Sequence, residues 1–139
     1  MSARGGGGRR RRGRELALRA MFELEGSDKD ALAVLAYQGE EVGATADVSD
    51  FARHLVIGCL SRRDEVDATI SAVSRWPLTE LGKVERAILR ISVLELLEPD
   101  ATPVPVVVDE ALELTRTYAG DDAVQYVNGV LGQVARQRV

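Results

Sequence analysis

A run of arginines near the amino terminus holds the side chains of this sequence whose chemistry is easiest to read. Six of the first fourteen residues are arginine, none is acidic, and four glycines (5–8) precede the densest part of the run. Guanidinium groups offer fixed pairs of donors that match a phosphate, and clustered cations attract polyanions from a distance. Residues 15–139 hold 12 basic and 22 acidic residues, so the rest of the chain repels nucleic acid. We therefore expect nucleic-acid binding to be concentrated at the arginine run.

The same run is also compatible with a solvated tail that binds nothing, because short basic termini are often disordered. However, the arginines continue without a break through Arg14 into a segment of helical apolar spacing, residues 15–24. This continuity places them at the start of a helix. We expect residues 1–13 to form a flexible arginine-rich arm on a helical domain that spans residues 14–139.

The composition argues against enzyme chemistry. The chain has one histidine, His54, and one cysteine, Cys59, and it lacks a glycine-rich phosphate loop. The acidic pairs 109–110 and 121–122 lie where helices are predicted to begin, and carboxylates are favourable at that end of the helix dipole. We expect no enzymatic activity, no cofactor and no metal site, and a protein that acts by binding.

The sequence also predicts a location. It contains no apolar run near the roughly 20 residues that a transmembrane helix needs, and no secretory signal. We expect a cytoplasmic protein that does not associate with membranes.

Helices must position these side chains, because the apolar residues recur at helical spacing nearly throughout. Ser27, with Asp30 three residues later, is expected to start the second helix, and Gly120 is expected to end the sixth in a left-handed conformation. Trp76 and Pro77 interrupt the pattern. The fold class is therefore all-α: a single-domain bundle of about seven helices in two packed halves, residues 14–76 and 77–139. The predicted helices cover residues 15–24, 28–37, 48–61, 62–75, 84–97, 106–118 and 122–136.

Three segments, in this order and spacing, resemble the NusB family of bacterial transcription antitermination factors. The first is RRRRGRELALRAMFELE at residues 9–25, and the second is LGKVERAILRISVLELL at residues 81–97. The third is PVVVDEALELTRTYAGDDAVQYVNGVLGQVAR at residues 105–136, in which VNGVL is the most specific part. The resemblance implies a seven-helix NusB-like bundle that binds boxA RNA of nascent ribosomal transcripts together with the ribosomal protein NusE. It also implies a role in the antitermination complex of RNA polymerase.

The resemblance further implies which residues bind. The RNA-binding positions that it indicates are Arg9, Arg10, Arg11, Arg12, Arg14, Phe22, Asp122 and Tyr126. Glu80 and Glu85 match acidic positions on the face that meets NusE, with a solvated helix face as the alternative for each. Gly13 stands where the family has a better helix former, and it is expected to loosen the arm.

The roles expected at three of the implied RNA positions differ from one another. Phe22 fits base stacking as well as a place in the apolar core of the first helix. Tyr126 is expected to stack on RNA or to donate to it. Asp122 is expected to cap the last helix and to weaken RNA binding by repelling phosphate.

Two other functions remain open at this stage: a DNA-binding helical regulator, and a non-enzymatic interaction scaffold with a solvated basic tail. The first needs a recognition helix rich in base-reading side chains, and no helix after the first has one. Deleting residues 1–13 tests the second, since RNA affinity should collapse if the arm binds RNA. The sequence leaves open whether the protein is a monomer or a homodimer.

Overall fold

A computed structural model describes residues 2–98 and 101–137 of the chain, and side chains from residue 8 onwards. These described residues form α-helices and one short 3-10 helix, η1, without a strand. The elements are α1 (Ser2–Leu24), α2 (Ala31–Glu41), α3 (Ala46–Ser61), α4 (Arg63–Val73), η1 (Leu78–Glu80), α5 (Lys83–Leu97), α6 (Val104–Tyr118) and α7 (Asp121–Gln137). The predicted all-α bundle of about seven helices is confirmed.

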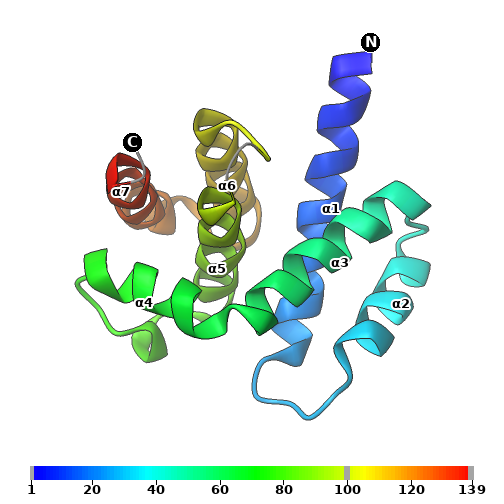
Figure 1. Cartoon of the computed structure of the whole chain (residues 1–139), viewed down its shortest axis with the longest axis horizontal. Coiled ribbons are helices and arrows are strands. Elements are labelled where there is room, and N and C mark those ends of the chain that lie inside the picture. Colours follow the sequence, from blue (N-terminus) through cyan, green and yellow to red (C-terminus); the bar gives the residue numbers. More distant parts are fainter. Residues whose placement is uncertain (1, 99–100, 138–139) are drawn as a thin grey trace.

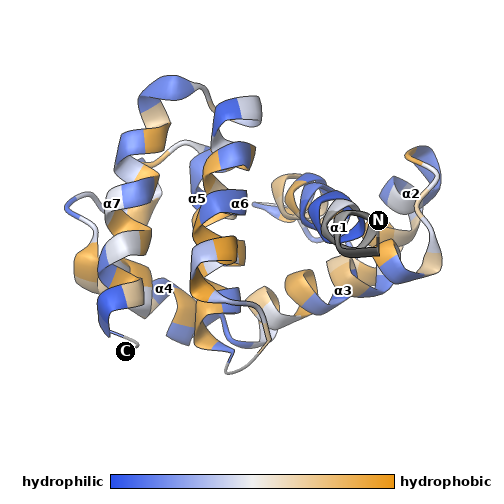
Figure 2. Ribbon diagram, turned by 90° about the horizontal axis from the view of Figure 1, so that it is seen from above, coloured by the Kyte–Doolittle hydropathy of each residue, from blue (hydrophilic) through white to orange (hydrophobic). Residues whose placement is uncertain are grey.

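Helix α5 lies at the centre of the bundle and packs against α1, α3, α4, α6 and α7 (Figure 1). Between residues 87 and 97 every residue except Arg90 is buried, as expected of a helix surrounded by others. Apolar residues recur along α3 and α5 at helical spacing (Figure 2). Their burial supplies the main driving force for folding.

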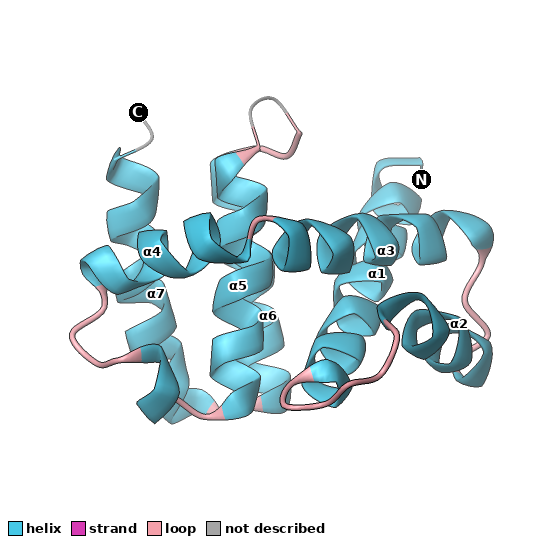
Figure 3. Cartoon of the chain, turned by 60° about the horizontal axis from the view of Figure 1, so that its bottom comes forward, coloured by secondary structure: helices cyan, strands magenta, loops and turns pink. Residues whose placement is uncertain are grey.

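Helices α3 and α4 follow one another across the upright helices α1, α5 and α7 (Figure 3). Helix α1 packs mainly against α3, and also against α2 and α5. Helix α4 lies before the expected division near residue 76, yet it packs against α5 and α7. Helix packing therefore does not follow that division.

The ends of the helices explain where the sequence prediction succeeded and where it failed. Gly120 has a φ of 100°, so the predicted left-handed residue after α6 is confirmed. Ser27 does not start the second helix, because the Asp30 side chain accepts a hydrogen bond from the Ala33 amide at 2.9 Å and caps α2. Residues 2–13 are the first part of α1 here, and the flexibility expected of the arm stays a prediction.

No helix in the described ranges is both long enough and apolar enough to cross a membrane.

Candidate nucleic-acid interface

Arg9, Arg10, Arg11 and Arg12 are all exposed on α1, and we call them the arginine segment. The helix carries them past α3 on one side and α6 on the other. Successive residues of a helix point in directions about 100° apart, so the four guanidinium groups reach different neighbours.

Two of these arginines are paired with carboxylates of the helical body, by which we mean helices α2 to α7. Arg9 lies 3.0 Å from Asp47 of α3. Arg11 donates from Nε and Nη2 to the two carboxylate oxygens of Glu110 of α6, at 3.0 and 2.8 Å. The hydrogen bond from Arg11 holds the pKa of Glu110 below its usual value, although partial burial opposes this shift. Glu110 therefore stays ionised at neutral pH.

The other two arginines have no carboxylate partner within the described residues. Arg10 lies over the ring of Phe51, with its guanidinium carbon 4.2 Å from the ring centroid. This cation–π contact fixes the side chain and leaves its positive charge in place. Arg12 is exposed and forms no ion pair with any described residue. Arg10 and Arg12 are thus the arginines that offer an unneutralised charge.

Arg14 does not belong to this surface, which corrects its assignment to RNA. It is 3% exposed, and its Nε and Nη2 donate to the two oxygens of the equally buried Glu95 of α5, both at 2.8 Å. Helical periodicity explains the burial, because Arg14 shares a face of α1 with the buried residues Ala17 and Met21. Glu95, an acidic residue inside an apolar helix, was the signal in the sequence that could have revealed this pair.

Gly13 has a packing role that the sequence did not predict, and the loosening expected of it stays a prediction. It is buried, and a Cβ atom at this position would lie 2.7 Å from Cδ2 of Phe51. The absence of a side chain lets Phe51 approach α1 closely. Phe51 in turn supports Arg10, so Gly13 helps to position the arginine segment.

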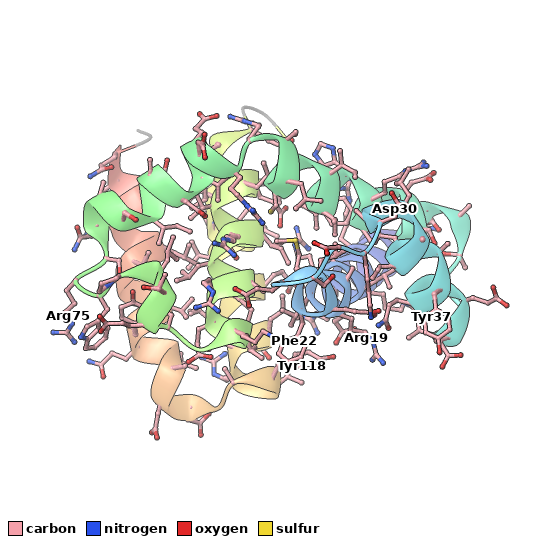
Figure 4. All side chains as sticks on the ribbon, turned by 90° about the horizontal axis from the view of Figure 1, so that it is seen from below. Arg19, Phe22, Asp30, Tyr37, Arg75 and Tyr118 are labelled. Atoms are coloured by element: carbon pink, nitrogen blue, oxygen red, sulfur yellow. The ribbon has the colours of Figure 1, made fainter. Side chains whose placement is uncertain are left out.

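Phe22 is 45% exposed, so its alternative assignment to the core is wrong. It lines a shallow pocket with Leu18, Arg19, Val84 and Tyr118, and Lys83 lies 4.9 Å from its ring centroid. Figure 4 shows Arg19, Phe22 and Tyr118 near one another beside α1. Arg19 and Tyr118, which line this pocket, are not among the site residues that the sequence predicted. Arg19 follows Arg12 by two helical turns, and this spacing was the available signal.

A second region lies between η1 and α7, where a groove of about 830 Å³ opens to solvent. Its lining contains the remaining predicted site residues, Glu80, Glu85, Asp122 and Tyr126. None of the three carboxylates forms an ion pair with a described residue. We call this region the acidic groove. The structure thus brings together residues that the sequence had divided between RNA and NusE.

Tyr126 and Trp76 form the aromatic part of the acidic groove. Their ring centroids are 5.1 Å apart with a tilt of 46°, and the Tyr126 hydroxyl is hydrogen-bonded to the Ser74 hydroxyl. Arg75 lies over the Trp76 ring at 4.4 Å and is far from Arg19 along the molecule (Figure 4). Trp76 is another residue that the sequence analysis missed, because it was interpreted only as a helix break.

Asp122 is exposed in the first turn of α7, but the helix begins at Asp121, so Asp122 lies inside the helix and does not occupy the capping position expected of it. The carboxylate lies at the positive end of that helix dipole. It therefore adds negative charge to the rim of the acidic groove.

Comparison with known proteins places this geometry in context. The model of the NusB family matches residues 11–136. The chain is similar to the transcription antitermination protein NusB of Heliobacterium modesticaldum, with 35% identity over 92% of this chain, and it spans 63% of that relative's length. It is also similar to the proteins of the same name from Desulforamulus reducens (36% identity, 90% of this chain, 88% of that protein) and Anaeromyxobacter dehalogenans (43%, 91% and 90%).

Solved structures give the same result for the fold. T. maritima NusB superposes with a TM-score of 0.83 at 29% identity, covering 92% of this chain and 91% of that chain. A chain from the crystal structure of the antitermination factors NusB and NusE in complex with dsRNA superposes with a TM-score of 0.85 at 25% identity, covering 93% and 97%.

Proposed function

The chain belongs to the NusB family, and on that premise we propose that it is a transcription antitermination factor that binds boxA RNA together with NusE. In this role it supports processive transcription by RNA polymerase, acts in the cytoplasm and has no catalytic activity. The observation that carries the proposal is the presence of two separate binding surfaces with different charge on one helical bundle.

The arginine segment supplies the RNA surface. Arg10 and Arg12 carry unneutralised charges that can contact phosphate, and Phe22 presents an exposed ring farther along the same helix. Base stacking on an aromatic side chain is the usual way in which proteins hold single-stranded RNA. Arg14 takes no part in this surface because its donors are used inside the bundle.

The acidic groove supplies the protein surface. A ribosomal protein is basic, so Glu80 and Glu85 attract it and help to set its orientation. Tyr126 and Asp122 share the groove, so RNA held by NusE can also reach them. Trp76, an exposed aromatic residue, adds an apolar contact area of the kind that dominates interface energies.

Two observations speak against the other functions considered. A DNA-binding regulator reads bases with the amino-terminal part of a recognition helix. The helix after α1 that exposes the most base-reading side chains is α7, and it begins with Asp121 and Asp122, which repel the phosphate backbone. An idle tail leaves its arginines free in solvent, whereas Arg9, Arg10 and Arg11 each contact the body.

The test is binding of labelled boxA RNA and of a scrambled RNA of equal length to the full chain, with and without NusE, across a salt series. We expect a preference for boxA RNA that NusE strengthens. The variant Arg10→Gln/Arg12→Gln should weaken binding by about tenfold or more and should flatten the log–log salt slope by about 1.4, since each phosphate contact contributes about 0.7.

The matched control is Arg63→Gln/Arg136→Gln, which removes the same charge from exposed positions on α4 and α7. It should leave both the affinity and the slope close to those of the unaltered chain. Equal binding of boxA and scrambled RNA, with NusE present, would contradict the proposed function.

A further inference from the structure

Glu110 lies beside the arginine segment and differs from the other carboxylates there. Its side chain is 16% exposed, whereas that of Asp47 is 52% exposed. Both of its oxygens accept hydrogen bonds from Arg11, and Arg14 Nη1 lies 3.9 Å away. The carboxylate is thus partly enclosed between α6 and α1 and faces two guanidinium groups.

This geometry makes the Arg11–Glu110 pair harder to displace than the Arg9–Asp47 pair. An ion pair between two exposed side chains contributes little, because water and salt screen it. A two-point contact between a guanidinium and a carboxylate is stronger, and breaking it would leave a partly buried charge poorly partnered. Breaking the Arg9–Asp47 pair therefore costs less free energy than breaking the Arg11–Glu110 pair, so a phosphate displaces Asp47 from Arg9 more easily than it displaces Glu110 from Arg11.

We propose that Glu110 withholds Arg11 from RNA and thereby limits the affinity of the arginine segment for phosphate. A phosphate that approached Arg11 would find Nε and Nη2 occupied and would also face the Glu110 carboxylate. Phosphate contacts then come from Arg10 and Arg12, with Arg9 joining after it leaves Asp47. This inference rests on the proposed function, because it concerns the same RNA surface.

The consequence is a lower affinity for RNA of any sequence. Contacts to phosphate fix the position of a protein on nucleic acid but carry no sequence information. One arginine fewer in contact with phosphate leaves tight binding more dependent on base contacts and on the protein partner. Glu110 is then an affinity-limiting residue, and Arg11 is an arginine that stays bound to the body.

The experiment uses the full chain, boxA RNA and scrambled RNA of equal length, without NusE, across a salt series. Glu110→Gln keeps the shape of the side chain and removes its charge. We expect it to tighten binding of both RNAs by about three- to tenfold, and to steepen the log–log salt slope by about 0.7, the contribution of one phosphate on a single strand.

The matched control is Glu113→Gln, one helical turn later on α6. Glu113 is an exposed carboxylate that pairs with Arg116 at 2.9 Å, so this variant makes the same change in net charge without releasing Arg11. It should leave the salt slope unchanged. An equal gain in Glu113→Gln and Glu110→Gln would overturn the proposal, since net charge alone would then explain the effect.

Arg11 and Arg12 provide a second test in the otherwise unaltered chain, which does not depend on how Glu110→Gln folds. Arg11→Gln should leave the log–log salt slope unchanged, whereas Arg12→Gln should flatten it by about 0.7. Where Glu110→Gln does fold, adding Arg11→Gln to it should remove the steepening of the slope. Equal flattening of the slope by the two single arginine variants would overturn the role of Glu110 and leave the proposed function intact. If the unaltered chain fails to bind boxA RNA even with NusE, both proposals are wrong.

Discussion

The arginine segment and the acidic groove differ in how their charges are partnered. In the arginine segment, Arg9 and Arg11 are paired with carboxylates of other helices. In the acidic groove, Glu80, Glu85 and Asp122 form no ion pair with any residue that the structure describes. The basic run is thus less available than its sequence suggests, and the groove is more available. The charge that a segment contains is not the charge that it offers to a partner.

The difference follows from the neighbours of each region. The arginine segment passes between α3 and α6, and both helices present carboxylates toward it. The groove is bordered by η1 and α7, where Arg75 is the only lining cation among the described residues and lies over Trp76. Substitutions of these charged residues should therefore alter the difference in available charge between the arginine segment and the acidic groove.

The largest effect is expected on stability, at Arg14. This residue is the buried arginine that follows the exposed arginine segment. Arg14→Ala leaves Glu95 as a buried charge without its main partner, which should lower the free energy of unfolding by about 3–5 kcal/mol. Urea denaturation measures this loss. Arg12→Ala, two residues earlier on the exposed surface, is the control and should change the stability by less than about 0.5 kcal/mol. If the two variants lost similar amounts of unfolding free energy, the buried Arg14 would contribute no more to stability than an exposed arginine does.

The second effect concerns the groove. The variant Glu80→Lys/Glu85→Lys should slow association with NusE by about tenfold at low salt, because it replaces attraction with repulsion. The difference should shrink at high salt, where charges are screened. Stopped-flow or surface-based kinetics can measure it. Glu40→Lys/Glu41→Lys makes the same change of charge at the exposed end of α2 and should have a much smaller effect. If both variants slowed association with NusE equally, net charge would explain the effect and the acidic groove would have no specific role in it.

A smaller effect is expected at Asp122, a carboxylate that lines the acidic groove and forms no ion pair with any described residue. Asp122→Asn removes a charge that would repel phosphate under the proposed function, and it should tighten binding of boxA RNA by a few-fold. Asp121→Asn is the neighbouring control and should produce a smaller gain, because Asp121 does not line the groove. Unchanged or weaker binding by Asp122→Asn would contradict its tempering role.

The smallest effect concerns how stability depends on pH, through the ion pair between Glu25 and Arg86 beside η1. Arg86 donates to Glu25 at 2.5 Å and to the carbonyls of Leu78 and Leu81, so it ties η1 to α1. The hydrogen bond from Arg86 lowers the pKa of Glu25 from 4.5. A lowered carboxyl pKa stabilises the fold above about pH 4.5, and this stability is lost as the pH falls through the lower folded value.

Melting temperatures measured between pH 7 and pH 3 provide the test. Glu25→Gln should melt at a lower temperature than the unaltered chain at pH 7, and the difference should narrow toward pH 3. The exposed Glu41→Gln, which removes a charge without an ion pair, serves as the control. A difference that stays constant with pH would show that Glu25 does not contribute through its charge.

Much of the fold could be predicted because it depends on local rules. The spacing of apolar residues identified the helices, and Gly120 identified a helix end. The prediction failed at the start of α2, where Ser27 and Asp30 both fit the pattern and only the backbone geometry decided between them. It also failed for Trp76, whose neighbour Pro77 marked a break but gave no indication of the aromatic contact with Tyr126.

The sequence by itself determined the family, the class of fold, and the presence of a basic segment on an acidic body. The family followed from the resemblance of three segments to known proteins, whereas the fold class and the charge layout follow from composition and from patterns within single helices. Only the tertiary structure decided which charges are available, because the decisive partners are distant in the chain. Arg14 and Glu95 are 81 residues apart, and Arg11 and Glu110 are 99 apart. Such pairs exist only once the helices have come together, and a local pattern in the sequence can single out Glu95 as unusual but cannot name its partner.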